Sequence, residues 1–181
     1  QSHSFVQAWS RVIAMLSSRF PNTVLALCQM PQKDRTNLVL RQRNCLACCN
    51  EIARRAADRG ILTVFHPNSP AGSVFRSAED YDVMINGLNS RFIGYAPDAG
   101  HIARGGMDPV AVFTRYAQVI RHVHFKDMDA TGGWAEMGKG CIDFPGIVGV
   151  LKQTGYRGWI MVEDESPRAE QDPDGVTRSN G

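Results

Sequence analysis

The feature that most constrains the fold is a regular alternation of two kinds of segment along the 181 residues. Short apolar runs predict buried strands, and longer stretches bounded by capping residues predict helices. Five strands are expected, at residues 22–29, 61–66, 91–98, 121–127 and 157–165. Helices are expected at residues 5–20, 41–59, 77–88, 108–120 and 144–156. Strands that alternate with helices form right-handed βαβ units, so the sequence predicts an α/β fold whose parallel sheet is covered on both faces.

Composition and charge narrow the class of protein. A hydrophobic content of 43% and a charged content of 21% are ordinary for a globular domain. We expect one partial domain at residues 1–165 and a polar tail of little regular structure at 166–181. The net charge of +2 argues against nucleic acid or an acidic membrane surface as a partner, and no apolar run approaches a membrane span. These features predict a cytoplasmic protein.

Three of the five cysteines lie in one predicted helix. Cys45 and Cys48 form a CxxC pair, and Cys49 follows directly. A zinc site would need a second such pair, and Cys28 and Cys141 stand alone. We therefore predict reduced structural thiols, with Cys48 or Cys49 facing the core.

Each predicted strand ends in polar or reactive residues. These residues are Gln29, His66, Asp98, Lys126 with Asp127, and Glu163. The carboxyl ends of parallel strands are where α/β folds bind ligands. In the segment RHVHFKD, alternation also sends His122, His124 and Lys126 to one face, which would be a costly way to build a core. This edge is therefore predicted to be a ligand site.

The residue types at this edge suit a metal ion. Asp98, His124 and Glu163 offer two carboxylates and an imidazole, a donor set that favours Mn²⁺, Mg²⁺ or Co²⁺ over Zn²⁺. Such an ion can bind two oxygens of a polyol or hydroxy-ketone. It then stabilises the oxyanion that forms when the substrate loses a proton from the neighbouring C–H group. Each residue also has a structural alternative. Asp98 could cap a turn, His124 could be a core histidine bonded to a carbonyl, and Glu163 could belong to a solvated acidic cluster.

Four sequence motifs are similar to those of a known protein family. YAPDAGH, HVHFKD, GKGCIDFPGIVGVLKQTGYRGW and IMVEDE together resemble the xylose isomerase-like TIM-barrel superfamily, and within it the sugar phosphate isomerase/epimerase and inosose dehydratase branch. The resemblance runs from about Asn22 to Glu165. It implies a (β/α)₈ barrel with a divalent metal at its C-terminal mouth.

The resemblance also implies roles for individual residues. Asp98, His124 and Glu163 match metal ligands, and Glu163 doubles as a catalytic acid/base candidate. His101 matches a substrate-contacting residue, and Lys126 falls where such enzymes place a polar substrate contact, so both are also catalytic candidates.

Two further residues are expected to lie near the candidate ligands. His122 is expected to be structural or to support the ligands. Trp134, in a glycine-bearing loop, is expected either to line the substrate pocket or to serve as packing.

The chain departs from the family pattern in its number of strands. A full barrel has eight strands and about 250 residues, whereas five strands are predicted here. If residues 157–165 form the last strand, the first three strands are missing. An open set of five would leave a raw edge and an exposed apolar interior, which a homo-oligomer or a partner's strands would cover.

A second departure concerns the fourth ligand. Many relatives carry a glutamate at the end of the strand that corresponds to 61–66, whereas this sequence reads TVFHPNSP. His66 or Asn68 takes that place, as a metal ligand or a substrate contact. The following loop has no carboxylate before Glu79. A single acid/base carboxylate favours isomerisation or dehydration over two-base epimerisation.

The sequence therefore predicts a metal-dependent sugar or cyclitol isomerase or epimerase, which moves a proton next to a carbonyl. An inosose-type dehydratase is one alternative, and a non-catalytic sugar-binding or scaffold protein is another. An endonuclease-like relative acting on abasic DNA would share the barrel. The near-neutral charge and the lack of residues for a multi-metal cluster count against it.

Overall fold

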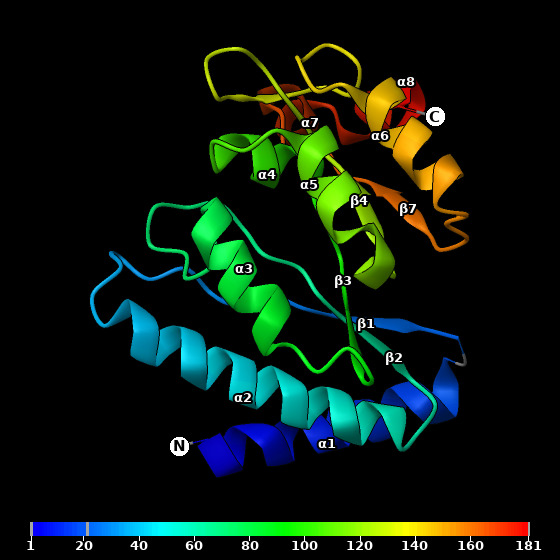
Figure 1. Cartoon of the computed structure of the whole chain (residues 1–181). Helices are drawn as coiled ribbons and strands as arrows, with labels where there is room; N and C mark the ends of the chain where they lie inside the picture. The colour runs from blue at the N-terminus through cyan, green and yellow to red at the C-terminus, as the bar shows by residue number, and fades with distance from the viewer. Residues whose placement is uncertain (1, 21, 181) are drawn as a thin grey trace. The chain divides into compact units, whose positions relative to one another are not determined.

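The computed structural model of the protein describes residues 2–20 and 22–180. The chain divides into two compact units, residues 1–96 and 97–181, and Figure 1 labels all of their α-helices and the five parallel strands. Among the described residues, no helix combines the length and the apolar character that crossing a bilayer requires.

The first unit is built on a three-stranded parallel sheet in the order β1-β2-β3. Its strands are β1 (Val24–Leu27), β2 (Leu62–Phe65) and β3 (Ile93–Tyr95). In the middle of the sheet Val64 pairs with Ala26 on one side and with Gly94 on the other. Each strand lies inside a predicted strand, so this part of the prediction is confirmed.

Three helices accompany this sheet: α1 (Ser2–Arg19), α2 (Leu38–Ala57) and α3 (Ala78–Gly87). Helix α2 contacts α1, α3 and β2. Its buried residues Cys49, Ile52, Ala53 and Ala56 follow the helical period, which gives α2 one continuous apolar stripe. Cys49 lies in the core as predicted, and all five cysteines of the chain are free thiols.

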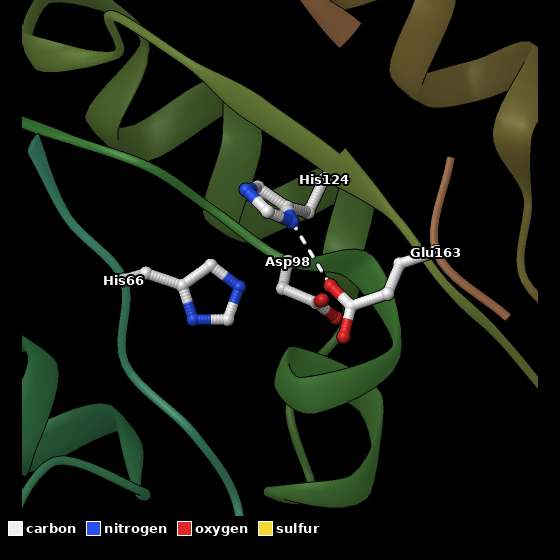
Figure 2. Close-up of side chains that lie close together, drawn as sticks. All are labelled: His66, Asp98, His124 and Glu163. Atoms are coloured by element: carbon white, nitrogen blue, oxygen red, sulfur yellow. Dashed lines mark hydrogen bonds and ion pairs between the residues drawn. The ribbon is translucent and has the colours of Figure 1, made fainter. Parts of the chain in front are cut away.

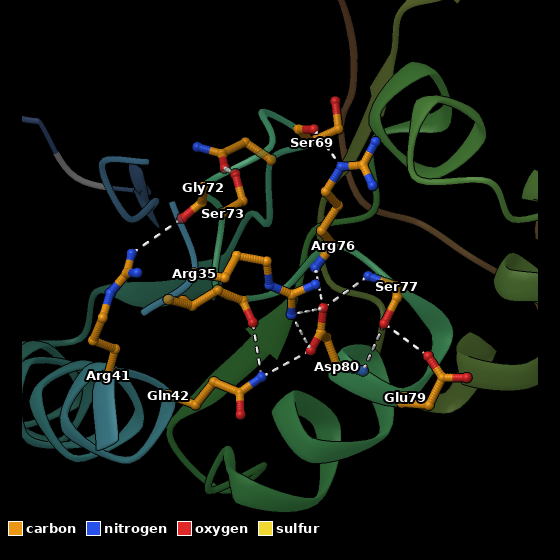
Figure 3. A network of polar contacts seen from close by, with 12 residues as sticks. Arg35, Arg41, Gln42, Ser69, Gly72, Ser73, Arg76, Ser77, Glu79 and Asp80 are labelled. Carbon is orange, nitrogen blue, oxygen red and sulfur yellow. Dashed lines mark hydrogen bonds and ion pairs between the residues drawn. The ribbon is translucent and has the colours of Figure 1, made fainter. Parts of the chain in front are cut away.

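A buried carboxylate ties the start of α3 to α2 and to the loop after β1 (Figure 3). Asp80 accepts hydrogen bonds from Arg35 at 2.6 Å, from Gln42 Nε2 at 2.9 Å and from the backbone N–H of Arg76 at 3.0 Å. It also accepts from the N–H of Ser77, whose side chain accepts from Asp80 N–H in return. This capping box begins α3 at the predicted place.

The second unit contains a parallel pair of strands and a short hairpin. The parallel pair is β4 (Val123–Phe125) with β7 (Ile160–Val162), and the antiparallel hairpin is β5 (Asp127–Met128) with β6 (Trp134–Ala135). With β4 and β7, all five parallel strands lie where the sequence predicts them. The hairpin was not predicted.

Three helices and a short 3₁₀ turn accompany these strands: α4 (Ala99–Arg104), α5 (Pro109–Tyr116), η1 (Ala117–Val119) and α6 (Phe144–Gln153). Asp108 caps α5 by accepting from the N–H of Val110, and Pro109 occupies its first turn, as predicted. Helix α4 was not predicted, and it contacts both β4 and β5.

Strand β7 exposes apolar side chains. Ile160, Met161 and Val162 retain 43–50% of their accessible surface, and Trp159 retains 72%. The prediction that every strand is covered on both faces is therefore wrong for β7. Within the described part of the chain, β7 pairs with β4 alone. This exposed strand agrees with the predicted raw apolar edge, and what covers it stays a prediction.

The last residues are helical, so the prediction of little regular structure there was wrong. They form α7 (Pro167–Gln171) and α8 (Pro173–Asn180). Ser166 caps α7 by accepting from the N–H of Ala169, and Val176 of α8 is 2% exposed. The segment is also tied to the rest of its unit by Arg168, which lies 2.8 Å from Glu136, and by Asn180, which donates to Asp164 at 2.9 Å. The boundary between residues 165 and 166 stays a prediction.

Candidate metal centre

Asp98, His124 and Glu163 converge in the second unit, where Figure 2 shows their side chains pointing toward one another. Each offers one ligand atom, and these atoms lie within 4.8 Å of one another. The backbone creates this proximity, because Asp98 forms a parallel bridge with His124. On the other side of β4, the N–H of Glu163 donates to the carbonyl of Phe125 at 2.9 Å.

Asp98 is fully buried and begins helix α4. Its Oδ1 accepts from the N–H of His101 at 2.8 Å. The capping alternative for Asp98 is therefore observed, and it does not compete with the ligand role. The cap holds the carboxylate in a fixed direction beside His124.

Glu163 is an ionised carboxylate. Its pKa is held well below the usual value, first by the hydrogen bond with His124 Nδ1 at 3.0 Å and then by Lys126, and these contacts outweigh the opposing effect of burial. An ionised carboxylate can only accept hydrogen bonds or bind a cation. Glu163 is thus in the state that a metal ligand or a general base requires.

Lys126 supplies a buried positive charge. Its side chain is 1% exposed, and Nζ lies 2.6 Å from Glu163 Oε1 and 3.1 Å from Glu165 Oε1. Burial alone would lower the pKa of Lys126, but the contacts with Glu163, Asp98 and Glu165 outweigh it and raise the pKa. Lys126 is therefore an ammonium group that donates hydrogen bonds and does not act as a base.

The donor set fits a divalent cation. Asp98, Glu163 and Glu165 carry three negative charges and Lys126 carries one positive charge, which leaves a formal charge of −2. Two carboxylate ligands and one imidazole suit ions of intermediate hardness, and the same donors also bind Zn²⁺. Asp98, His124 and Glu163 are the residues that would hold the ion, and their donors do not select among Mn²⁺, Mg²⁺, Co²⁺ and Zn²⁺.

Trp134 brings two other predicted site residues together. Its ring meets the buried ring of His101 edge-on, with centroids 5.2 Å apart, and Lys126 Nζ lies 4.9 Å from the Trp134 ring centroid. The guanidinium of Arg104 lies 4.5 Å from the same centroid. His122 packs edge-on against His124, with ring centroids 5.1 Å apart, and its supporting role stays a prediction.

His66 and Asn68 belong to the first unit, where they follow β2. The N–H of His66 donates to the carbonyl of Leu27 at 2.8 Å. Asn68 Oδ1 accepts from Gln29 and Ser73, and Asn68 Nδ2 donates to the Gln29 carbonyl and to Cys28 Sγ. These bonds fill the capacity of the amide, so a substrate or metal contact by Asn68 would have to replace one of them. The roles of His66 and Asn68 stay predictions.

Three residues near these side chains carry no role in the sequence prediction: Arg104, Asp127 and Glu165. Glu165 follows Glu163 by two positions, and the same period that aligned His124 with Lys126 could have identified it. Arg104 lies in a helix that the sequence did not reveal. Asp127 was noted only as a polar residue at a strand end.

Residues 9–179 match the family described as the xylose isomerase-like TIM barrel. The chain belongs to this family. The resemblance in the four motifs and the predicted barrel-type fold are thereby confirmed.

Curated relatives of this xylose isomerase-like chain include an inosose dehydratase of Clostridium beijerinckii. It is 31% identical over 142 residues, which cover 68% of this chain and 45% of the relative. The rhizopine catabolism protein MocC of Rhizobium meliloti is 37% identical over 141 residues, which cover 68% of this chain and 41% of the relative. The chain thus spans less than half the length of these relatives.

Solved structures support the fold. The IOLI protein, crystallised with a bound zinc atom, superposes with a TM-score of 0.82 over 98% of this chain and 66% of its own, at 13% identity. A D-tagatose 3-epimerase-like protein superposes with a TM-score of 0.74 over 97% of this chain and 67% of its own, at 21% identity. At these identities the likeness shows the xylose isomerase-like barrel architecture alone.

Proposed function

We propose that this chain carries the metal-binding half of an enzyme that removes a proton next to the carbonyl of a cyclitol or sugar and then expels water. The observation that carries the proposal is the convergence of Asp98, His124 and Glu163 within 4.8 Å. The inosose dehydratases among the relatives support dehydration of a cyclitol ketone as the overall reaction.

A bound divalent ion would supply Lewis acidity, which makes a C–H beside a carbonyl more acidic. The residues of the chain supply the proton transfers. Glu163 is ionised and can accept a proton, and Lys126 is charged and can donate a hydrogen bond to an oxygen that gains negative charge. His101 lies at the Trp134 ring, where its imidazole is the candidate to protonate the departing hydroxide. One proton and one hydroxide leave the substrate, so the net loss is one water.

A sugar isomerase or epimerase is the second candidate. It begins with the same proton removal and returns the proton to a carbon. The single ionised carboxylate of Glu163 is compatible with isomerisation, because one base can remove a proton from one carbon and return it to the neighbouring carbon.

Proton removal can be tested directly in deuterated water. The chain would be incubated with a cyclitol ketone and each of Mn²⁺, Co²⁺, Mg²⁺ and Zn²⁺ in turn, and followed by NMR. We expect deuterium to enter beside the carbonyl, with water loss for a dehydratase and without it for an isomerase. Asp98→Ala and Glu163→Gln should abolish both signals, whereas Glu79→Gln, an exposed control in the first unit, should leave them unchanged.

Two outcomes would contradict the proposal. Binding of the ion and the ketone without deuterium incorporation would favour a non-catalytic sugar-binding protein. Full turnover in folded Asp98→Ala and Glu163→Gln proteins would show that these two residues do not belong to the active site.

A further inference from the structure

Asp127 follows Lys126 in the sequence and is buried as well. Its side chain is 1% exposed, and both carboxylate oxygens are occupied by the backbone. Oδ1 accepts from the N–H of Met128 at 2.8 Å and of Ile142 at 3.3 Å. Oδ2 accepts from the N–H of Gly138 at 3.0 Å and of Gly140 at 2.9 Å. The Asp127 side chain therefore binds the backbone of residues 138–142, which form the C-terminal part of the 128–142 loop.

Two of the residues that donate to Asp127 are glycines, and both positions favour glycine. A Cβ at Gly140 would collide with Asp127 Oδ1 and with the carbonyl oxygen of Met128. Gly138 has a φ of +79°, a conformation that residues with a side chain rarely adopt. Glycine therefore allows the close approach of the backbone to Asp127 at position 140 and the left-handed backbone conformation at position 138.

The same loop carries Trp134 to the metal centre. The Trp134 ring contacts Lys126 and His101, and Lys126 in turn forms the 2.6 Å ion pair with Glu163. Gly100 lets the ring come close, because a Cβ there would lie 3.0 Å from Trp134 Cζ3 and 2.8 Å from the Lys126 carbonyl oxygen. Displacement of the loop would therefore disturb the wall formed by Trp134, Lys126 and His101.

We infer that Asp127 is a positioning residue, which anchors the 128–142 loop and so holds Trp134 against Lys126 and His101 as the substrate-facing wall of the metal centre. The inference rests on the proposed function for its effect on turnover, but not for its effect on the loop. Within the described residues, the Asp127 carboxylate bonds to backbone N–H groups of its own loop and not to the candidate ligands. It acts through Trp134 and Lys126.

A second aspartate of the loop provides a matched control. Asp129 Oδ1 accepts from the N–H and the hydroxyl of Thr131 and from the N–H of Gly133, all within the tight turn of the hairpin. Asp129 is thus similar to Asp127 in chemistry and in place, but its bonds are local. Asp129 closes the turn of the hairpin and forms no hydrogen bond with the described residues 136–142.

Two variants break the Asp127 contact in different ways. Asp127→Asn replaces one acceptor oxygen with an NH₂ group that faces backbone donors, and Gly140→Ala keeps the carboxylate but pushes the loop away from it. Hydrogen–deuterium exchange of the 136–142 segment reports loop order without any need for turnover. We expect exchange there to rise at least about tenfold in both variants, since a hydrogen bond to a charged group is worth that factor or more, and to stay unchanged in Asp129→Asn.

Turnover and ion binding then separate the roles. In the metal-loaded chain acting on a cyclitol ketone, we expect kcat/KM to fall by about 10–100-fold in Asp127→Asn and Gly140→Ala. The affinity for the divalent ion, measured by calorimetry, should stay within a factor of about two because the candidate ligands are untouched.

The outcomes distinguish this inference from the proposed function. Unchanged exchange in folded Asp127→Asn and Gly140→Ala proteins would overturn the anchoring role. Faster exchange with unchanged kcat/KM would overturn the effect on the site. If the unsubstituted chain showed no turnover with any ion, the proposed function would fail, whereas faster loop exchange in both variants would still support the anchor.

Discussion

Replacing Asp80 with alanine tests how the first unit is held together. The Asp80 side chain is 6% exposed and is paired with Arg35, whose side chain is 31% exposed. Removing one partner of a buried ion pair costs about 3–5 kcal/mol, and the partial exposure of Arg35 places the expected loss near the lower end of that range. The lost capping box at Ser77 acts in the same direction. We expect a loss of about 3 kcal/mol in the free energy of unfolding.

The measurement is urea unfolding followed by circular dichroism. With a slope of about 1–3 kcal/mol per molar urea, a loss of about 3 kcal/mol moves the midpoint by one molar or more. Glu79→Ala is the matched control, because Glu79 is the exposed neighbour in the same helical turn and its side chain accepts a hydrogen bond from the hydroxyl of Ser77. Its cost should stay below about 1 kcal/mol. If Asp80→Ala unfolded within 1 kcal/mol of the parent chain, the network of Figure 3 would not be a source of stability.

The same carboxylate predicts a dependence of stability on pH. Burial alone would raise the pKa of Asp80, but the N–H groups of Ser77 and Arg76 and the guanidinium of Arg35 outweigh it and lower the pKa. A lowered pKa in the folded state adds stability above the unfolded value of about 3.9, and this stability is lost as the pH falls through the folded pKa. Between pH 7 and pH 3 the parent chain should therefore lose more stability than Asp80→Ala does. Equal losses in the two proteins would contradict the assignment.

Three other changes have distinct expected results. Glu163→Gln should weaken binding of Mn²⁺ or Zn²⁺ by about tenfold or more in calorimetry, because a charged ligand is lost and Lys126 keeps its positive charge; unchanged affinity would exclude Glu163 as a ligand. Gly100→Ala should lower the thermal unfolding midpoint, since its Cβ meets the Lys126 backbone at 2.8 Å and the Trp134 ring at 3.0 Å; an unchanged midpoint would mean that the ring moves aside freely. Met161→Lys should reduce the binding of a hydrophobic dye and leave the unfolding midpoint within about 2 °C, because this side chain is 50% exposed; a large destabilisation would show that β7 is buried in solution.

The sequence was most informative where a pattern repeats. The apolar runs around Val64 and Val123 predicted their strands, and the parallel arrangement followed from the alternation with helices. The sequence also placed Asp98 and Glu163 at strand ends and His124 within the strand between them, which is why proximity among the three could be expected. The register that pairs Phe125 with Val162, and so sets Glu163 beside His124, is a property of packing that one sequence does not encode visibly.

Other elements were missed for physical reasons. Helix α4 is six residues long and contains Gly100, so it shows no helical period. Strands β5 and β6 have two residues each, and their pairing depends on the turn closed by Asp129. Helices α7 and α8 expose most of their residues, and the signals in this segment are two helix starts, Ser166 before Pro167 and Asp172 before Pro173.

The cap formed by Asp98 links the first turn of α4 to the geometry of the cation pocket. An aspartate reaches the N–H of His101 at 2.8 Å with its short side chain, and a glutamate at the same position would carry the carboxylate one methylene further. Equal charge would therefore not make the two acids interchangeable. Length, rather than electrostatics, would set which acid this position tolerates, and an engineer who wished to retune the preferred ion would have to rebuild the helix start as well.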